Sequence, residues 1–152
     1  MLEIGAPVPT VPVKTDTGET VTLQEYLGQR VMIFFYPRSD TEACTVEASE
    51  IRDEVAGFGD LGVTVIGVSP DGVRAQAKFR AKYSLPYTLL ADEDHALAEA
   101  FGVWGMKKFM GRDYMGVMRT TYIVEADGRI SHVFANVKAR GHARLVLDSL
   151  RG

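Results

Sequence analysis

The single cysteine of the chain, Cys44, is the side chain whose type and surroundings best suit covalent chemistry. It stands in the segment PRSDTEACTVEAS, residues 37–49, which follows the apolar run VMIFFY. That run is typical of a strand buried on both faces, and a proline ends it. Ser39 and Glu42 then have the spacing of a capping box, and Thr41 is a second candidate cap. The sequence therefore predicts that Cys44 lies in the first turns of a helix.

A cysteine at such a position suits a nucleophile. A helix amino terminus carries unpaired N–H groups and about half a positive charge, and both stabilise a thiolate. An ordinary thiol is only a few per cent ionised at neutral pH, so this stabilisation matters for reactivity. The alternative is a small buried hydrophobe, as most free cysteines are. The polar neighbours Thr45 and Glu47 indicate that Cys44 stands off the apolar face of its helix, which favours the nucleophile.

The rest of the chain predicts strands and helices in alternation. From the amino terminus we expect a hairpin within 6–22, a helical turn at 23–27, a strand at 31–36, a helix ending at Gly59, a strand at 63–68, a helix at 73–83, a strand at 88–90, a helix at 95–101, a loop rich in glycine and methionine, a hairpin of strands 120–124 and 130–134, and a helix at 143–150. Strand–helix–strand order implies parallel pairing and a sheet covered on both faces. The expected fold class is α/β and thioredoxin-like. We expect a central mixed sheet flanked by helices, an amino-terminal β-hairpin extension and a single domain over residues 1–152.

Composition excludes several classes of function. The 152 residues suit one domain with its own core. With 17 basic and 20 acidic residues the net charge is −3, and no basic cluster is longer than Lys107-Lys108, so a nucleic-acid partner is not expected. One cysteine excludes an intrachain disulfide and favours a reducing compartment. No signal peptide or membrane-spanning run is evident. We therefore expect a soluble cytoplasmic protein. Separately, we expect a monomer.

The segment Pro37-x-x-x-Thr41-x-x-Cys44 resembles the signature of the peroxiredoxins, in which Pro, Thr or Ser, and Cys have this spacing. The wider resemblance is to the bacterioferritin comigratory protein, or peroxiredoxin Q, subfamily, and it covers nearly the whole chain. The words that carry it are Phe35–Pro37, Cys44–Ala48, Val103–Gly105, Tyr114–Gly116, Arg119–Thr121 and Gly141–Ala143.

The resemblance implies a thioredoxin fold and a thiol-dependent peroxidase that reduces hydrogen peroxide and alkyl hydroperoxides. Cys44 would be the peroxidatic cysteine, whose thiolate attacks the O–O bond and becomes a sulfenic acid. Thr41 would hydrogen-bond the peroxide and the sulfur, and Arg119 would stabilise the thiolate and the transition state. Pro37 would shield the site, and Glu47 would orient Arg119. Fixed donors and a permanent cation suit charge that builds on a leaving oxygen. No metal or organic cofactor is needed, because the sulfur itself is oxidised and reduced again.

The chain departs from the subfamily at three places. Ser49 stands where many members carry the resolving cysteine, five residues after the peroxidatic one, and the chain has no second cysteine. The resemblance then implies an external thiol reductant, such as thioredoxin, glutaredoxin with glutathione, or a small thiol. Serine for cysteine is also a common engineered substitution, and both origins remain open. Glu42-Ala43 replaces a frequent Pro-Gly; Glu42 favours the helix start but opposes a nearby thiolate. Met106 replaces a residue that is commonly polar.

The stretch from residue 106 to residue 118 holds four of the six methionines. They either line an apolar wall for organic hydroperoxides or serve as pliable packing around a loop. The basic side chains of this stretch, Lys107, Lys108 and Arg112, are expected on a solvated loop that could dock a reductase. The three histidines show no ligand spacing, so a zinc site is not expected.

Two other functions compete with the peroxidase. A non-enzymatic redox sensor or binding protein on the same fold would combine fast oxidation of Cys44 with slow turnover by every reductant. A cysteine hydrolase needs a histidine base held by Asp or Asn, and no local signature marks such a set. A dithiol oxidoreductase is excluded, since there is no Cys-x-x-Cys.

Overall fold

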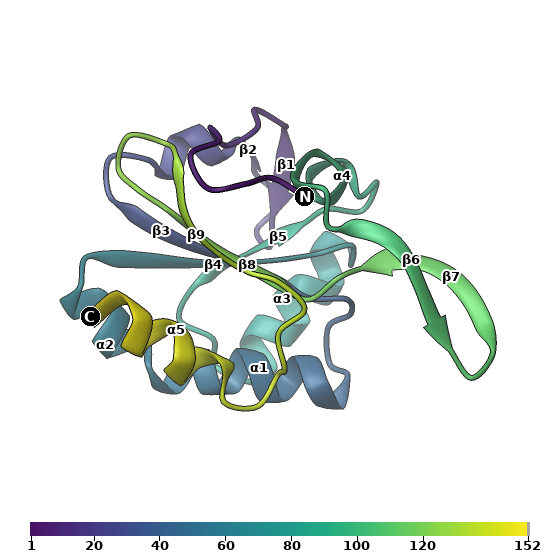
Figure 1. Cartoon of the computed structure of the whole chain (residues 1–152). Helices are drawn as coiled ribbons and strands as arrows, with labels where there is room; N and C mark the ends of the chain where they lie inside the picture. The colour runs from purple at the N-terminus through teal and green to yellow at the C-terminus, as the bar shows by residue number, and fades with distance from the viewer. Residues whose placement is uncertain (152) are drawn as a thin grey trace.

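The computed structural model of the protein describes residues 1–151, in which the main sheet is mixed and has the strand order β2-β1-β5-β4-β3-β8-β9 (Figure 1). Strand β4 (Val63–Ser69) pairs in parallel with β3 (Arg30–Phe35) and with β5 (Thr88–Ala91). Strand β8 (Thr120–Val124) runs antiparallel to β3 and to β9 (Ile130–Phe134). The parallel pairing expected from strand–helix–strand order is confirmed, and so is the closing antiparallel hairpin.

Helices cover both faces of this sheet. Figure 1 shows α1, α2, α3 and α5 on one face and α4 on the other, and the amino-terminal hairpin extends the sheet beyond β5. The hairpin consists of β1 and β2, and β1 joins the main sheet through β5, as the predicted extension requires. The bounds of these elements are β1 (Val13–Thr15), β2 (Thr20–Val21), the 3₁₀ turn η1 (Leu23–Tyr26), α1 (Glu42–Asp53), α2 (Val55–Asp60), α3 (Val73–Lys82), α4 (Ala96–Phe101) and α5 (His142–Arg151). Among residues 1–151, no helix combines the length and the apolar character that crossing a bilayer requires.

The core forms two apolar layers, one on each face of the sheet. Successive residues of β3 point to opposite layers: Met32 and Phe34 pack with α1 and α5, whereas Val31 and Ile33 pack with α4. All four side chains are at most 1% exposed, so neither face of β3 tolerates a polar residue. This double burial explains why the strand reads as a continuous apolar run in the sequence.

The helix expected to end at Gly59 is instead two helices. Helix α1 ends at Asp53, and Glu54 has φ −104° and ψ 5°, outside the helical region. Helix α2 then runs through Gly59 to Asp60. The two glycines of this stretch, at positions 57 and 59, lie inside α2 and so do not cause the break at Glu54. The apolar spacing still held across the break, which is why periodicity alone predicted one helix.

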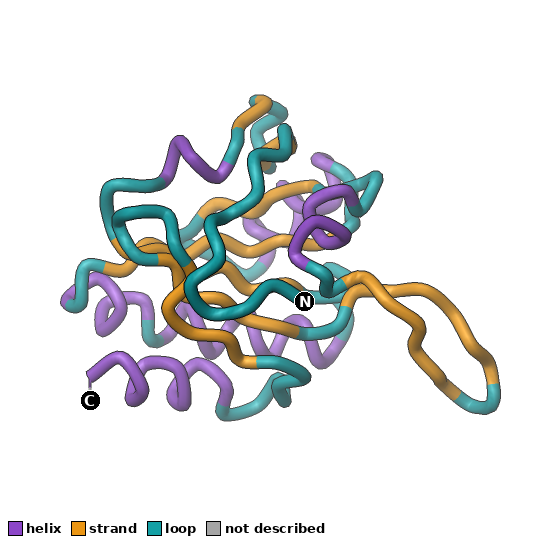
Figure 2. The backbone as a smooth tube through the Cα atoms, turned by 45° about the horizontal axis from the view of Figure 1, so that its top comes forward, coloured by secondary structure: helices purple, strands orange, loops and turns teal. Residues whose placement is uncertain are grey.

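The glycine- and methionine-rich stretch expected as a loop forms a second, two-stranded sheet. Strand β6 (Trp104–Phe109) pairs antiparallel with β7 (Arg112–Val117). Met110 and Gly111 connect them with φ of 51° and 78°. Positive φ at both central residues is the geometry of a tight hairpin turn, usually supplied by Asn-Gly. Met-Gly hides that signal, so the sequence prediction was wrong. Figure 2 shows the hairpin extending away from the body of the protein.

Candidate active site

Strand register brings Arg119 to the cysteine. Strands β3 and β8 are antiparallel, and Phe35 pairs with Thr120, so the end of β3 and the start of β8 meet at one edge of the sheet. Arg119 is the residue just before β8, and Cys44 lies in α1, the helix that follows β3. The Arg119 guanidinium Nη2 donates to Cys44 Sγ over 3.4 Å. Residues far apart in the sequence are thus adjacent at the helix start.

Glu47 completes this cluster. It lies three residues after Cys44 in α1, so the two side chains share one helix face. Its Oε1 accepts a hydrogen bond from Arg119 Nη1 over 2.7 Å, and the planar guanidinium therefore bridges carboxylate and sulfur. Cys44 and Glu47 are each 1% exposed, and Cys44 packs in the same layer as Ala48 and Ile51. The expectation that Cys44 stands off the apolar face is therefore wrong, because positions 44, 48 and 51 repeat with the helical period.

Thr41 and Pro37 flank the cysteine. Thr41 is the amino-terminal cap residue of α1, and its hydroxyl donates to the Arg38 carbonyl over 2.9 Å. The capping box expected from Ser39 and Glu42 is not formed. A helix capped by Ser39 would begin at residue 40, whereas α1 begins at Glu42. Pro37 is half-buried and lines a hollow of about 360 Å³ beside the helix start. Cys44 itself is buried, and the lining of this hollow reaches the active-site loop only at Pro37 and Arg38.

The loop between β3 and α1 is anchored by residues that the sequence analysis missed. Asp71 Oδ2 accepts from the Ser39 backbone N–H and hydroxyl over 2.7 and 2.8 Å. The Ser39 hydroxyl also contacts Gln76 Oε1 at 2.8 Å, and the Tyr36 hydroxyl donates to the same oxygen. The sequence did contain a signal for Asp71. This residue follows the end of β4, and functional sites in α/β sheets gather at that edge.

Ser49 lies in the same helix as Cys44 and is half-buried. Five residues of α-helix turn the side chain by about 140° and raise it by roughly 7.5 Å. A disulfide requires Cα atoms within about 6.8 Å of each other. Position 49 therefore has no direct access to Cys44 while α1 is intact.

The electrostatics of the cluster are set by burial. Burial raises the pKa of Glu47 to about 7, although the Arg119 charge opposes the rise. Glu47 Oε2 is buried without a hydrogen-bond partner among the described residues, which adds to the cost of ionising it. Burial lowers the pKa of Arg119, but the charges of Glu47 and Cys44 more than offset this, so the net shift is upward and the cation persists. Burial, with the nearby Arg119, lowers the pKa of His142 to about 4, so its ring is neutral where it meets the Thr121 hydroxyl at 2.7 Å.

Replacing Glu47 with glutamine is expected to remove a pH dependence of stability. Because its folded-state pKa is raised, the contribution of Glu47 to the unfolding free energy is complete below pH of about 4.5 and is lost as pH rises through about 7. At about 1.36 kcal/mol per pKa unit, the loss is a few kcal/mol. His142 contributes the opposite slope over an overlapping range. The measurement is therefore the difference in unfolding free energy between wild type and Glu47→Gln, by denaturant titration at several pH values. Parallel curves across this range would contradict the assignment.

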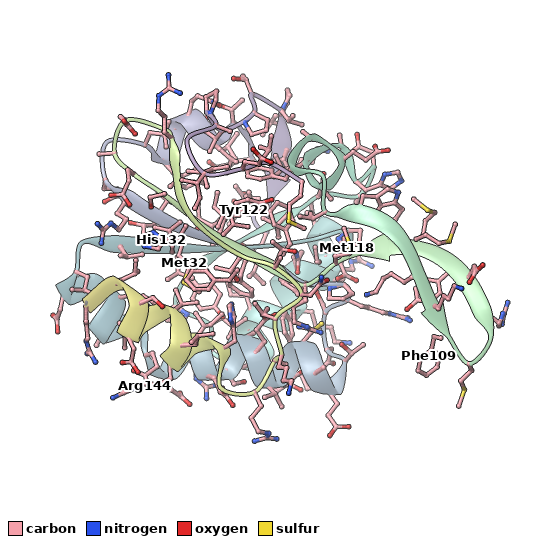
Figure 3. All side chains as sticks on the ribbon, viewed as in Figure 1. Met32, Phe109, Met118, Tyr122, His132 and Arg144 are labelled. Carbon is pink, nitrogen blue, oxygen red and sulfur yellow. The ribbon has the colours of Figure 1, made fainter. Side chains whose placement is uncertain are left out.

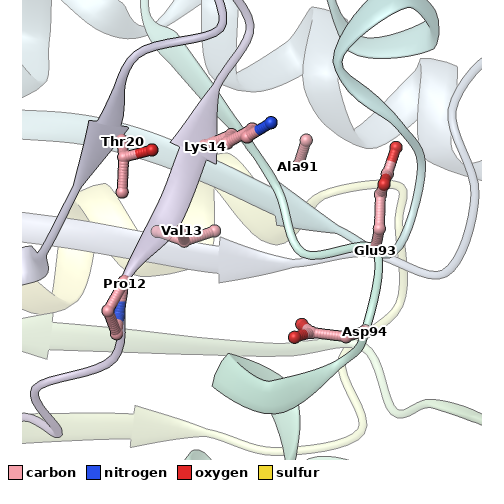
Figure 4. Close-up of a pocket in the computed structure, with 7 residues that line it drawn as sticks. All are labelled: Pro12, Val13, Lys14, Thr20, Ala91, Glu93 and Asp94. Atoms are coloured by element: carbon pink, nitrogen blue, oxygen red, sulfur yellow. The ribbon is translucent and has the colours of Figure 1, made fainter.

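Another hollow lies apart from this cluster. Pro12 and residues of β1 and β2 line it on one side, and Ala91, Glu93 and Asp94 line it on the other (Figure 4). None of the Pro37–Cys44 segment lines it. Within residues 1–151, no group of three or more His, Cys, Asp or Glu side chains is placed to hold a metal ion.

The family model described as AhpC/TSA matches residues 4–133 of the chain. Two proteins named peroxiredoxin Bcp, from Bacillus subtilis and Escherichia coli, are each 41% identical over 150 residues, which cover 99% of this chain and 96% of each relative.

Solved structures agree with this assignment. The bacterioferritin comigratory protein of Xanthomonas campestris, described in trapped intermediate and ligand complexes that concern its alkyl peroxide reduction, superposes with a TM-score of 0.87 at 29% identity, over 95% of this chain and 96% of that one. The peroxidoxin BcpB of Mycobacterium tuberculosis gives a TM-score of 0.87 at 32% identity, over 99% and 97% of the two chains. The thioredoxin-like fold expected from the sequence is confirmed. The chain therefore belongs to the AhpC/TSA family and is a peroxiredoxin, a thiol-dependent peroxidase, of the Bcp or peroxiredoxin Q type.

Proposed function

We propose that the protein reduces hydrogen peroxide and alkyl hydroperoxides through Cys44 alone. The observation that carries this is the forked contact of Arg119 with Cys44 Sγ and Glu47 Oε1. The thiolate attacks the nearer peroxide oxygen, the O–O bond breaks, and the departing alkoxide or hydroxide takes up a proton. The products are an alcohol or water and the sulfenic acid of Cys44. An external thiol then displaces water from the sulfenic sulfur, and a second thiol releases the mixed disulfide and restores Cys44.

The neighbouring side chains have distinct roles in this proposal. Arg119 holds the thiolate and stabilises the charge that develops on the leaving oxygen. Glu47 holds the guanidinium in place, and Pro37 shields the sulfur. Thr41 donates to the bound peroxide, which requires its hydroxyl to turn from the Arg38 carbonyl, to which it donates over 2.9 Å. Donors of this kind often align only when the substrate is bound.

The reductant comes from outside the chain. Cys44 is the only cysteine in the sequence, and in this proposal Ser49 stands where related proteins carry a resolving cysteine. Thioredoxin, glutaredoxin with glutathione, or a small thiol is the proposed partner, in the cytoplasm and with the protein acting as a single-domain monomer.

The rate of thiol loss tests this function. Purified, reduced protein is mixed with hydrogen peroxide in a stopped-flow instrument, and turnover is then followed with each class of reductant. Fast oxidation with turnover by at least one reductant supports the peroxidase. Fast oxidation with negligible turnover by all of them favours the redox sensor, and oxidation no faster than that of a free thiol contradicts both.

Placing a cysteine at position 49 is expected to create a two-cysteine enzyme. Ser49→Cys can reach Cys44 only if the first turns of α1 unwind, and helix ends are the part that opens most easily. After one equivalent of peroxide, intact mass should show the loss of two hydrogens. The parent should gain oxygen and progress to sulfinic acid. Helical circular dichroism should fall in the oxidised variant and return with dithiothreitol.

Ser49→Ala is the matched control and should behave as the parent does. Accumulation of sulfinic acid in Ser49→Cys as fast as in the parent, without an internal disulfide, would mean that residue 49 is not a resolving position.

A further inference from the structure

The hollow beside the active-site loop has walls from three parts of the chain. Pro37 and Arg38 come from the loop that leads into α1, Pro70 follows β4, and Trp104, Lys107 and Val117 come from the β6–β7 hairpin. Its volume is about 360 Å³. Figure 3 shows Met118 at the base of this hairpin and Phe109 near its outer end. The lining of the hollow runs from the paired Trp104 and Val117, next to the base, to Lys107 farther along β6. We call it the Lys107 hollow.

Lys107 is not on a solvated loop, contrary to the sequence expectation. It is half-buried in β6, whereas Lys108, the next residue, is exposed. Its stem lies over Gly116, where an added Cβ would come within 3.1 Å of Lys107 Cδ. Its ammonium donates to the Val117 carbonyl over 2.9 Å. A backbone hydrogen bond and a packed stem therefore fix one cation in the wall of the hollow.

The charges around the hollow are unbalanced. Arg38 and Lys107 line it, and no acidic side chain among residues 1–151 does. Lys107 lies close enough to the cluster for its pKa to be lowered, first by burial and then by the Arg119 charge, while Cys44 opposes the shift. An anion would stabilise the partly buried Lys107 ammonium against the nearby charge of Arg119. The ammonium still has two N–H donors after its hydrogen bond to the Val117 carbonyl. The remaining walls are mainly apolar, so the hollow suits an organic molecule with one anionic end.

We propose that the Lys107 hollow binds the carboxylate end of organic hydroperoxides, with Lys107 as the cation that holds it, so that the enzyme prefers hydroperoxides that carry a carboxylate. The proposal rests on the peroxidase function proposed above. Lys107 is a specificity-determining residue in this scheme, and the chemistry at Cys44 is unchanged.

A hydroperoxide fits this hollow better than the reducing thiol does. The hollow exists in the closed arrangement, in which Cys44 is 1% exposed and held by Arg119. A peroxide reacts in that arrangement, because its reacting end is small. A reducing thiol must reach the buried sulfur of the sulfenic acid, and we expect this to require opening of the first turn of α1, which would move the adjoining wall made by Pro37 and Arg38.

Matched pairs of hydroperoxides test the proposal. The rate constant for Cys44 oxidation is measured by stopped flow with 4-carboxycumene hydroperoxide and its methyl ester, and with the 9-hydroperoxide of linoleic acid and its methyl ester. Wild type should prefer the acid in at least one pair by about tenfold, the scale of one hydrogen bond to a charged group. Lys107→Met keeps the apolar stem and should lower the ratio of the acid rate to the ester rate to about one, whatever the common change in the two rates. Lys107→Arg should retain part of it.

Lys108→Met, the same change on the exposed neighbour, is the control and should keep the preference. Equal rates for acid and ester in wild type, in both pairs, would overturn the proposal. So would a loss in Lys107→Met that is the same for acids, esters and hydrogen peroxide. Failure of the peroxidase function itself is distinguishable, because hydrogen peroxide would then oxidise wild type no faster than it oxidises a free thiol.

Discussion

Replacement of Cys44 by serine is expected to abolish peroxidase activity and to leave the fold intact. Cys44 is the only side chain in the sequence that can pass through a sulfenic acid, so no other residue can take over the reaction. The variant should fold because serine is close in size to cysteine and its hydroxyl can accept the hydrogen bond that Arg119 now donates to the sulfur. Peroxide consumption with an excess of reductant should fall to the rate without enzyme.

Circular dichroism and the denaturation midpoint of Cys44→Ser control for folding. A second variant, Cys44→Ala, removes both the sulfur and the acceptor, and it should be equally inactive. Peroxide consumption at the parental rate in a folded Cys44→Ser protein would refute the proposed mechanism.

Replacement of Arg119 by methionine is expected to slow Cys44 oxidation by about 10²-fold or more, the scale of one lost transition-state donor. The change removes the donor to Cys44 Sγ and the permanent charge beside the leaving oxygen. It also leaves Glu47 buried without its partner, and breaking a buried pair costs about 3–5 kcal/mol of stability. Because Glu47 can take up a proton instead, part of that cost is relieved at neutral pH.

Two further variants separate catalysis from stability. Arg119→Met combined with Glu47→Gln removes the orphaned carboxylate, and it should regain stability without regaining speed. Arg119→Lys keeps the charge but loses the forked guanidinium that spans sulfur and carboxylate. Its rate of Cys44 oxidation should therefore lie between those of the parent and Arg119→Met. Arg112→Met, on the exposed part of the hairpin, is the control and should oxidise at the parental rate. Unchanged oxidation speed in Arg119→Met would exclude the proposed role.

Local order was readable from the sequence. The apolar run that became β3, the helix after it, and the strand–helix–strand order all depend on contacts within a few residues or on one strand's two faces. The position of Cys44 at a helix start and the resemblance carried by its neighbours followed from the same short segment. These features are local, and side-chain type and spacing therefore determine them.

Only the tertiary structure decided which distant residues meet. The register of β8 on β3 places Arg119 against Cys44, and a pairing shifted by one residue would turn its side chain to the other face. The anchoring of Ser39 by Asp71 depends on the end of β4 lying beside the end of β3. One local feature was also missed. Met110 adopts the left-handed conformation of a hairpin turn, which its residue type does not predict, and that hairpin places Lys107 in the hollow beside the active-site loop. Long-range pairing and an unusual turn residue leave no periodic signal, so the assembled site could not be read from spacing alone.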